Sequence, residues 1–157
     1  MTETTSNRTW IEPIDVEGLL RQAMLILAGN AQIRLEGDFN LSDLSDFDNI
    51  GAMPMIPDGC GRASPDSQSV VVLPLEPETL SPLFDLFDRR ELRDKMEAVQ
   101  ILKAGVVQFL AGDCFYPECI SVGSVVSSSI LKQQAAKGLI SAYSLANEFG
   151  QIVRRPI

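Results

Sequence analysis

The chain has 157 residues, of which 45% are hydrophobic and 22% are charged, as expected for one globular domain that can bury a core without disulfides or a metal. It contains no histidine, which excludes Ser-His-Asp and Cys-His catalysis and metal ligation by imidazole. Its formal net charge is −8, which favours basic partners over nucleic acid.

The negative charge is concentrated in the middle third of the chain. Residues 36–88 contain eleven acids and one base, Arg62, and therefore carry −10, whereas the remainder of the chain carries +2. Such a stretch repels phosphate groups and accelerates the approach of a basic protein. Solubility alone is an alternative reason for acidic residues at a surface.

The sequence shows neither a secretory signal nor a membrane span. The first ten residues are polar, and the longest apolar runs, such as residues 70–75, are far shorter than the ~18 residues that suggest a membrane span. The three cysteines are an odd number and widely spaced, which favours a reducing compartment. We therefore expect a cytoplasmic protein without a membrane partner.

The first part of the chain predicts a tail, a helix and a strand. Residues 1–10 are polar and lack periodicity, so we expect a disordered tail. Residues 15–28 have the spacing of an amphipathic helix, and Asp15 can cap its start. The helix presents an apolar face to the core that includes Leu20, Met24 and Leu27. Residues 31–36 alternate between apolar and polar, as a half-buried strand does.

The remaining patterns predict a long loop followed by a more regular second half. Residues 51–69 hold several glycines and prolines and predict a flexible loop. Ser81-Pro82 resembles a helix cap followed by a first-turn proline, and Ser127 is a second cap. The later elements are expected to be a central strand (70–73), a helix beginning at 79 or 81, a hairpin (98–102 and 106–111), a strand (119–122), a helix (127–137), a strand (139–143) and a loose tail (147–157).

Together these elements predict a single α+β domain over residues 11–146. Its sheet is mixed and mostly antiparallel, and it packs with about three helices. We expect Val71, Ile101 and Phe109 to be buried positions of the strands.

The cysteines are weak candidates for chemistry. Cys114 and Cys119 are flanked by Asp113 and Glu118, whose negative charge raises the pKa of a nearby thiol and disfavours the reactive thiolate. A C-x4-C spacing with no second pair and no histidine is also unlike a zinc site. We expect structural cysteines.

The loop aspartates do not form a calcium-binding loop. Asp46 and Asp48 fit the first and third ligand positions, but Ile50 and Pro57 occupy positions that need oxygen ligands. We therefore predict no metal site, no cofactor and no catalytic residue.

One other segment could hold an anion. Ser127 and Ser128 begin a helix, where unpaired N–H groups attract negative charge, and Lys132 lies one turn further on. The segment lacks both the P-loop and the dinucleotide-binding patterns, so an ordinary serine cap is the alternative.

The favoured hypothesis is a non-catalytic interaction protein, such as an inhibitor, an adaptor or an immunity-type module. It would bind a basic partner through the acidic residues 36–88, with Asp38, Asp43, Asp46 and Asp48 as the contact residues. The alternative is an enzyme or small-ligand-binding protein with a pocket under residues 51–69.

Overall fold

The computed structural model describes residues 8–38, 51–52, 69–90, 94–112, 119–146 and 152–156. These residues form an α+β arrangement, which confirms the predicted fold class. The elements are β1 (Thr9–Pro13), α1 (Val16–Leu27), β2 (Ala31–Gly37), β3 (Gly51–Ala52), β4 (Ser69–Leu75), the 3-10 helix η3 (Pro77–Thr79), α2 (Leu80–Asp88), β5 (Met96–Lys103), β6 (Val106–Ala111), β7 (Ile120–Val122), α4 (Ser128–Ala136), β8 (Ile140–Ala146) and β9 (Ile152–Pro156).

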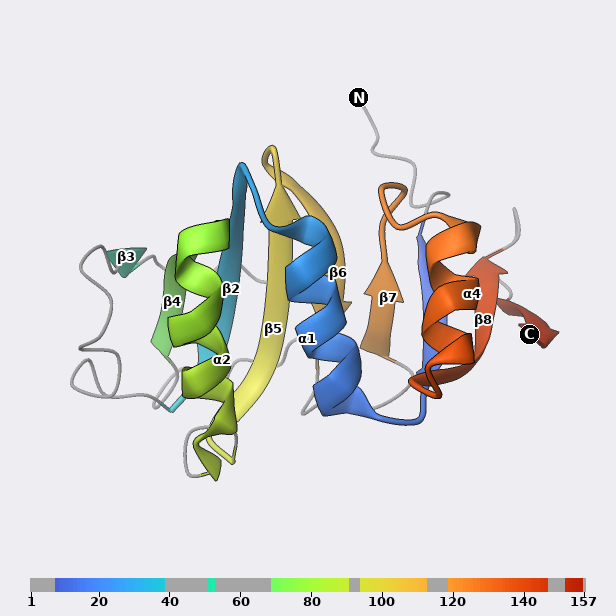
Figure 1. Cartoon of the computed structure of the whole chain (residues 1–157), viewed down its shortest axis with the longest axis horizontal. Coiled ribbons are helices and arrows are strands. Elements are labelled where there is room, and N and C mark those ends of the chain that lie inside the picture. The colour runs from blue at the N-terminus through green and yellow to red at the C-terminus, as the bar shows by residue number, and fades with distance from the viewer. Residues whose placement is uncertain are drawn as a thin grey trace.

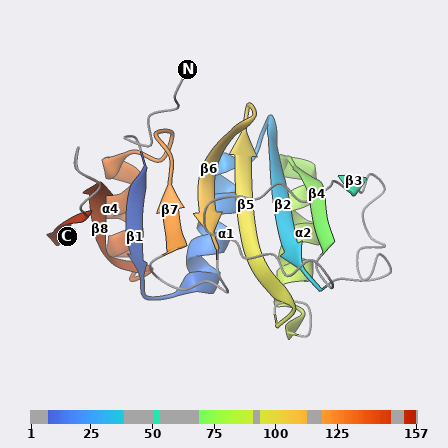
Figure 2. The same cartoon turned by 180° about the vertical axis from the view of Figure 1, so that it is seen from behind.

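The strands form one sheet in the order β3-β4-β2-β5-β6-β7-β1-β8-β9. Every pairing between the described strands is antiparallel. The helices α1, α2 and α4 lie against the same face of this sheet, as the two opposite views show (Figures 1 and 2). The molecule therefore has two layers, and the other face of the sheet carries none of these helices.

The core lies between the helices and the sheet, as the sequence predicts. The helix residues Leu20, Met24 and Leu27 are buried. The strand residues predicted to be buried are also inside, namely Val71, Ile101 and Phe109. The alternation of β2 is equally clear, because its odd-numbered residues from Ala31 to Leu35 are buried and its even-numbered residues are more exposed.

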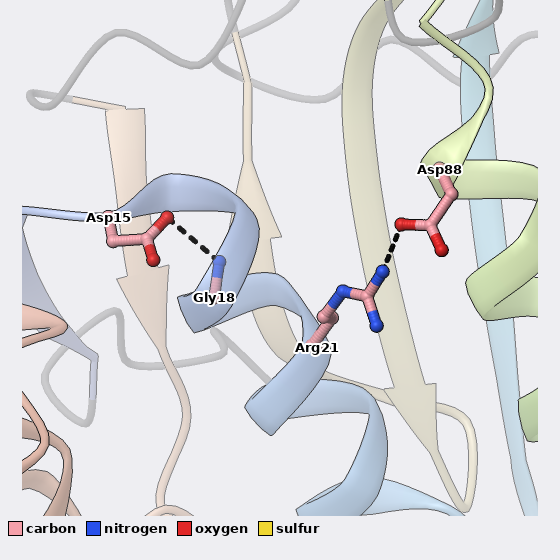
Figure 3. A network of polar contacts seen from close by, with 4 residues as sticks. All are labelled: Asp15, Gly18, Arg21 and Asp88. Atoms are coloured by element: carbon pink, nitrogen blue, oxygen red, sulfur yellow. Dashed lines mark hydrogen bonds and ion pairs between the residues drawn. The ribbon is translucent and has the colours of Figure 1, made fainter.

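The N-terminal end of α1 explains why a glycine stands inside this helix. The Asp15 carboxylate accepts a hydrogen bond at 3.0 Å from the Gly18 N–H, so Asp15 is the predicted N-cap (Figure 3). A methyl group on Gly18 would lie 2.6 Å from Asp15 Oδ2 and 2.7 Å from Leu139 Cδ2. Glycine therefore fits beside the cap and the α4–β8 connection, whereas a larger residue would have to displace the ends of these two side chains.

Helices α1 and α2 are joined by a polar contact at their surface. The Arg21 guanidinium forms an ion pair with the Asp88 carboxylate (Figure 3). The same guanidinium lies 5.2 Å from the centre of the Phe84 ring, within the range of a cation–π contact. Both side chains of the ion pair are exposed enough for water to weaken their attraction, so the contact orients the helices more than it stabilises them.

The N-terminal boundary of the domain differs from the predicted one. Residues 1–10 were expected to be a tail, but β1 begins at Thr9 and lies between β7 and β8 inside the sheet. The Arg8 guanidinium secures this position, because it donates to Ser121 Oγ at 2.9 and 3.0 Å and to the Val107 carbonyl at 3.1 Å. Residues far along the chain hold β1 in the sheet, and the local sequence pattern does not show which residues these are.

The start of α2 also differs from the sequence prediction. Ser81-Pro82 does not begin the helix, because Leu80 is its first residue and η3 directly precedes it. The Thr79 hydroxyl donates to the Pro74 carbonyl at 2.7 Å and accepts from the Glu76 N–H at 2.9 Å. The chain therefore enters the helix through a turn that Thr79 fixes.

Strand β4 is not central. Its residues Val70 and Val71 are both buried although they point to opposite faces, as the apolar run suggested. However, its outer neighbour β3 has two residues and pairs with Val71 and Val72 alone. Pro74 has no N–H to offer a further strand, and its carbonyl accepts from the Thr79 hydroxyl at 2.7 Å.

Parts of the predicted loop and C-terminal tail also belong to the sheet. Gly51 and Ala52 form β3, Ser69 begins β4, and residues 152–156 of the predicted tail form β9. Residues 53–68 and 147–151 lie outside the described part of the chain. Within the described ranges, no helix is both long and apolar enough to span a bilayer.

Candidate functional site

The structure describes one of the four aspartates predicted to contact a partner. Asp38 is exposed at the end of β2, where its N–H donates to the Lys95 carbonyl at 3.1 Å. Asp43, Asp46 and Asp48 lie outside the described residues. The predicted group of four is therefore represented by a single side chain.

A second set of acids from the same stretch lies on α2 and the turn before it. Glu78, Asp85 and Asp88 are exposed; Asp85 and Asp88 lie three positions apart on α2, and Glu78 lies in η3 directly before it. We call Glu78, Asp85 and Asp88 the acidic α2 face. Asp88 pairs with Arg21, whereas Glu78 and Asp85 form no ion pair with the described residues. This face therefore presents carboxylates to solvent.

The residues of the predicted anion site have ordinary structural roles. Ser127 caps α4, and its hydroxyl accepts a hydrogen bond from the Ile130 N–H at 3.3 Å. Ser128 and Lys132 are exposed on α4. The serine cap is therefore present, and the anion site stays a prediction.

One of the two cysteines that were expected to be structural lies within the described residues. Cys119 is half-buried immediately before β7, and Cys114 lies outside the described residues. Over the described ranges, no three cysteine or carboxylate side chains come together in a way that could hold a metal ion.

The sequence did not predict a pocket at the end of the sheet where three turns meet. The turns join α1 to β2, β4 to η3 and β5 to β6, and they lie at the upper end of the sheet in Figure 2. The concavity has a volume of about 410 Å³, within the usual range for a ligand site. We call it the three-turn pocket, and its lining includes Asn30, Gln32, Pro74, Glu76, Leu102 and Ala104.

Hydrogen bonds between the turns hold this pocket together. The Ala104 N–H donates to the Asn30 carbonyl at 3.1 Å, and the Asn30 N–H donates to Glu76 Oε2 at 3.3 Å. The Gly29 N–H donates to the Leu75 carbonyl at 3.0 Å. Each of the three turns is thereby bonded to another, so the walls of the pocket are pre-organised.

The β5–β6 turn adopts a conformation that few side chains prefer. Ala104 and Gly105 have φ values of 51° and 80°, both in the left-handed region, which matches the right-handed twist of a two-residue hairpin. Asn30, whose carbonyl accepts from the Ala104 N–H, has a φ of 49°. Two non-glycine residues with left-handed backbone therefore line one pocket.

The Lys103 ammonium binds the end of α1 and does not line the pocket. Its ammonium donates to the carbonyl oxygens of Leu27 at 3.1 Å, Ala28 at 3.4 Å and Gly29 at 2.9 Å. These carbonyls end α1, where a helix carries partial negative charge. All three donors of the lysine are therefore committed, and the pocket has Glu76 as its charged lining group.

A second, smaller cavity lies between α1, α4 and the sheet. Its volume is about 20 Å³, and apolar side chains such as Ile11, Phe109 and Leu131 line it. Gln134 also lines it, and the side-chain oxygen of this 3% exposed residue has no hydrogen-bond partner among the described residues. The cavity is too small for a ligand, so it is a packing defect of the core.

Comparison with known proteins adds no relative. The chain matches no known family model, no curated protein and no solved structure. The class of protein therefore has to be inferred from the two features described above, the acidic α2 face and the three-turn pocket.

Proposed function

We propose that this protein is a non-catalytic interaction protein that binds a basic protein partner through the acidic stretch of residues 36–88. The proposal includes a cytoplasmic location, because an odd number of widely spaced cysteines suits a reducing compartment. It excludes nucleic acid as the partner, because the phosphate backbone would meet the charge of −10 in this stretch.

The observation that carries the proposal is the acidic α2 face. Three exposed carboxylates on α2 and the turn before it, two of them without a described ion pair, attract a basic surface toward α2. Complementary charge of this kind acts mainly on the rate of association.

The test measures how fast a basic probe associates with the full chain. The probe is a labelled peptide of alternating lysine and glycine, mixed by stopped flow at about 0.01 M and about 0.1 M salt, where the Debye length is about 30 Å and about 10 Å. The double variant Glu78→Gln with Asp85→Asn should lower the association rate several-fold at the lower salt concentration. The difference should shrink at the higher one.

A matched control removes the same charge elsewhere. Asp94→Asn with Glu97→Gln also eliminates two carboxylates, but outside residues 36–88 and outside the acidic α2 face. This control should leave the association rate close to that of the unaltered protein. Equal rates for both double variants would mean that net charge alone attracts the probe, and the proposed surface would then be wrong.

A further inference from the structure

We infer that the three-turn pocket receives one long basic side chain of the partner, with Glu76 as its counter-ion. This inference rests on the proposed function and adds a specific contact to it. The acidic α2 face would guide the partner by long-range attraction, and the pocket would fix one of its residues.

The charge of the pocket selects a cation. None of the described lining residues is a lysine or arginine, and the nearby Lys103 ammonium is bound to three carbonyl oxygens. Glu76 is half-buried, and its carboxylate accepts from the Asn30 N–H and, in a capping box, from the Thr79 N–H, which uses two of about four acceptor positions on a carboxylate. The carboxylate therefore keeps acceptor capacity for an ammonium or guanidinium group, and an anion would be repelled.

The walls suit the rest of such a side chain. Pro74, Leu102 and Ala104 offer apolar surface on which the methylene groups of a lysine or arginine can lie. The amides of Asn30 and Gln32 add neutral polar groups to the lining. A pocket with one carboxylate, apolar walls and neutral amides matches a side chain that is apolar along its length and charged at its end.

Pre-organisation makes a single contact effective. The hydrogen bonds among the three turns hold Glu76 beside Asn30 before any ligand arrives. The Thr79 hydroxyl fixes the same turn through its bonds to Pro74 and Glu76. Binding then requires little ordering of the protein, which is a main cost of association.

The experiment follows the backbone amides of the full chain by NMR while a short peptide is added. The peptide is acetyl-Gly-Lys-Gly-amide, and its control has norleucine, which lacks the ammonium, in place of the lysine. The lysine peptide should shift the amides of Gln32, Glu76 and Ala104 in a saturable way, and the norleucine peptide should not. Unmoved pocket amides at about 10 mM lysine peptide, well above a millimolar Kd, would overturn the inference.

Two neighbouring glutamates provide matched variants. Glu76→Gln should weaken binding of the lysine peptide about tenfold, because a charged hydrogen bond becomes a neutral one. Glu78→Gln removes the same charge two residues away, outside the pocket lining, and should weaken binding less than about twofold. Equal losses for the two variants would overturn the inference.

A third variant keeps the test decisive if Glu76→Gln disturbs the turn. Gln32 is exposed in the pocket lining, and Gln32→Glu adds a second carboxylate there. This variant should tighten binding of the lysine peptide several-fold, and unchanged or weaker binding would count against the pocket. The stopped-flow test depends on the acidic α2 face and not on the pocket. If the basic probe associates as expected but the lysine peptide does not bind the pocket, this inference is wrong and the proposed function still stands.

Discussion

Replacing Lys103 with methionine would remove the ammonium that closes the C-terminal end of α1. The methionine keeps an apolar stem, so packing along the side chain changes little. The carbonyl groups of Leu27, Ala28 and Gly29 would lose a charged donor at 2.9–3.4 Å. They have no α-helical partner of their own, because the last carbonyls of a helix never do.

The expected loss follows from these contacts. Hydrogen bonds that involve a charged group contribute about 1.5–3 kcal/mol, and a cation at a helix C-terminus adds about 0.3–1 kcal/mol. Lys103 is half-buried, so water can replace part of the interaction in the variant. We expect the free energy of unfolding to fall by about 2 kcal/mol, which lowers the Tm of a domain of this size by about 4–8 °C.

The assay is urea unfolding followed by circular dichroism, with the midpoint and the slope fitted together. Lys132→Met is the control, because Lys132 is exposed in the middle of α4, away from the end of the helix. It removes the same charge and should cost less than about 0.5 kcal/mol. Equal losses for the two variants would show that the three carbonyl contacts contribute nothing beyond net charge.

Two further substitutions test the packing of the sheet and of α4. Gly37→Ala would place a methyl group 2.1 Å from the Lys95 carbonyl oxygen, a main-chain atom that cannot rotate away. The free energy of unfolding, measured in urea, should therefore fall by at least about 2 kcal/mol. A loss below about 1 kcal/mol would refute the clash. Gln134→Leu removes a buried oxygen that has no partner among the described residues and should stabilise the protein by about 1 kcal/mol, whereas the exposed Gln133→Leu should not. A destabilised Gln134→Leu would contradict this account.

The sequence predicts those elements whose determinants are local. Helix α1 begins and ends within one residue of the predicted bounds, because Asp15 caps it and its apolar face repeats with helical spacing. The cap of α4 at Ser127 and the hairpin turn at Ala104 and Gly105 are determined by neighbouring residues in the same way. Patterns of this kind depend on a few consecutive residues, so a single sequence is enough to recognise them.

The features that the sequence did not predict depend on distant partners. Strand β1 has five residues and ends in a proline, and only its pairing with β7 and β8 shows that it is a strand. The three-turn pocket joins Asn30 to Glu76, 46 positions further on, and to Ala104. Neither the strand pairing nor the pocket produces a periodic pattern in the sequence. Asn30 gave one signal, because asparagine adopts left-handed backbone more readily than most residues.

The position of β1 between β7 and β8 also limits when the sheet can form during synthesis. Six strands lie on one side of β1 and two on the other, so the sheet is continuous only through this strand. A ribosome makes Thr9 long before its partners Val122 and Leu145, which lie more than a hundred positions further along the chain. Strand β1 of the nascent chain must therefore wait without its partners, and contacts of such sequence separation fold slowly. A chain that stops before β7 would keep part of its apolar sheet face uncovered, and such surfaces are prone to aggregate.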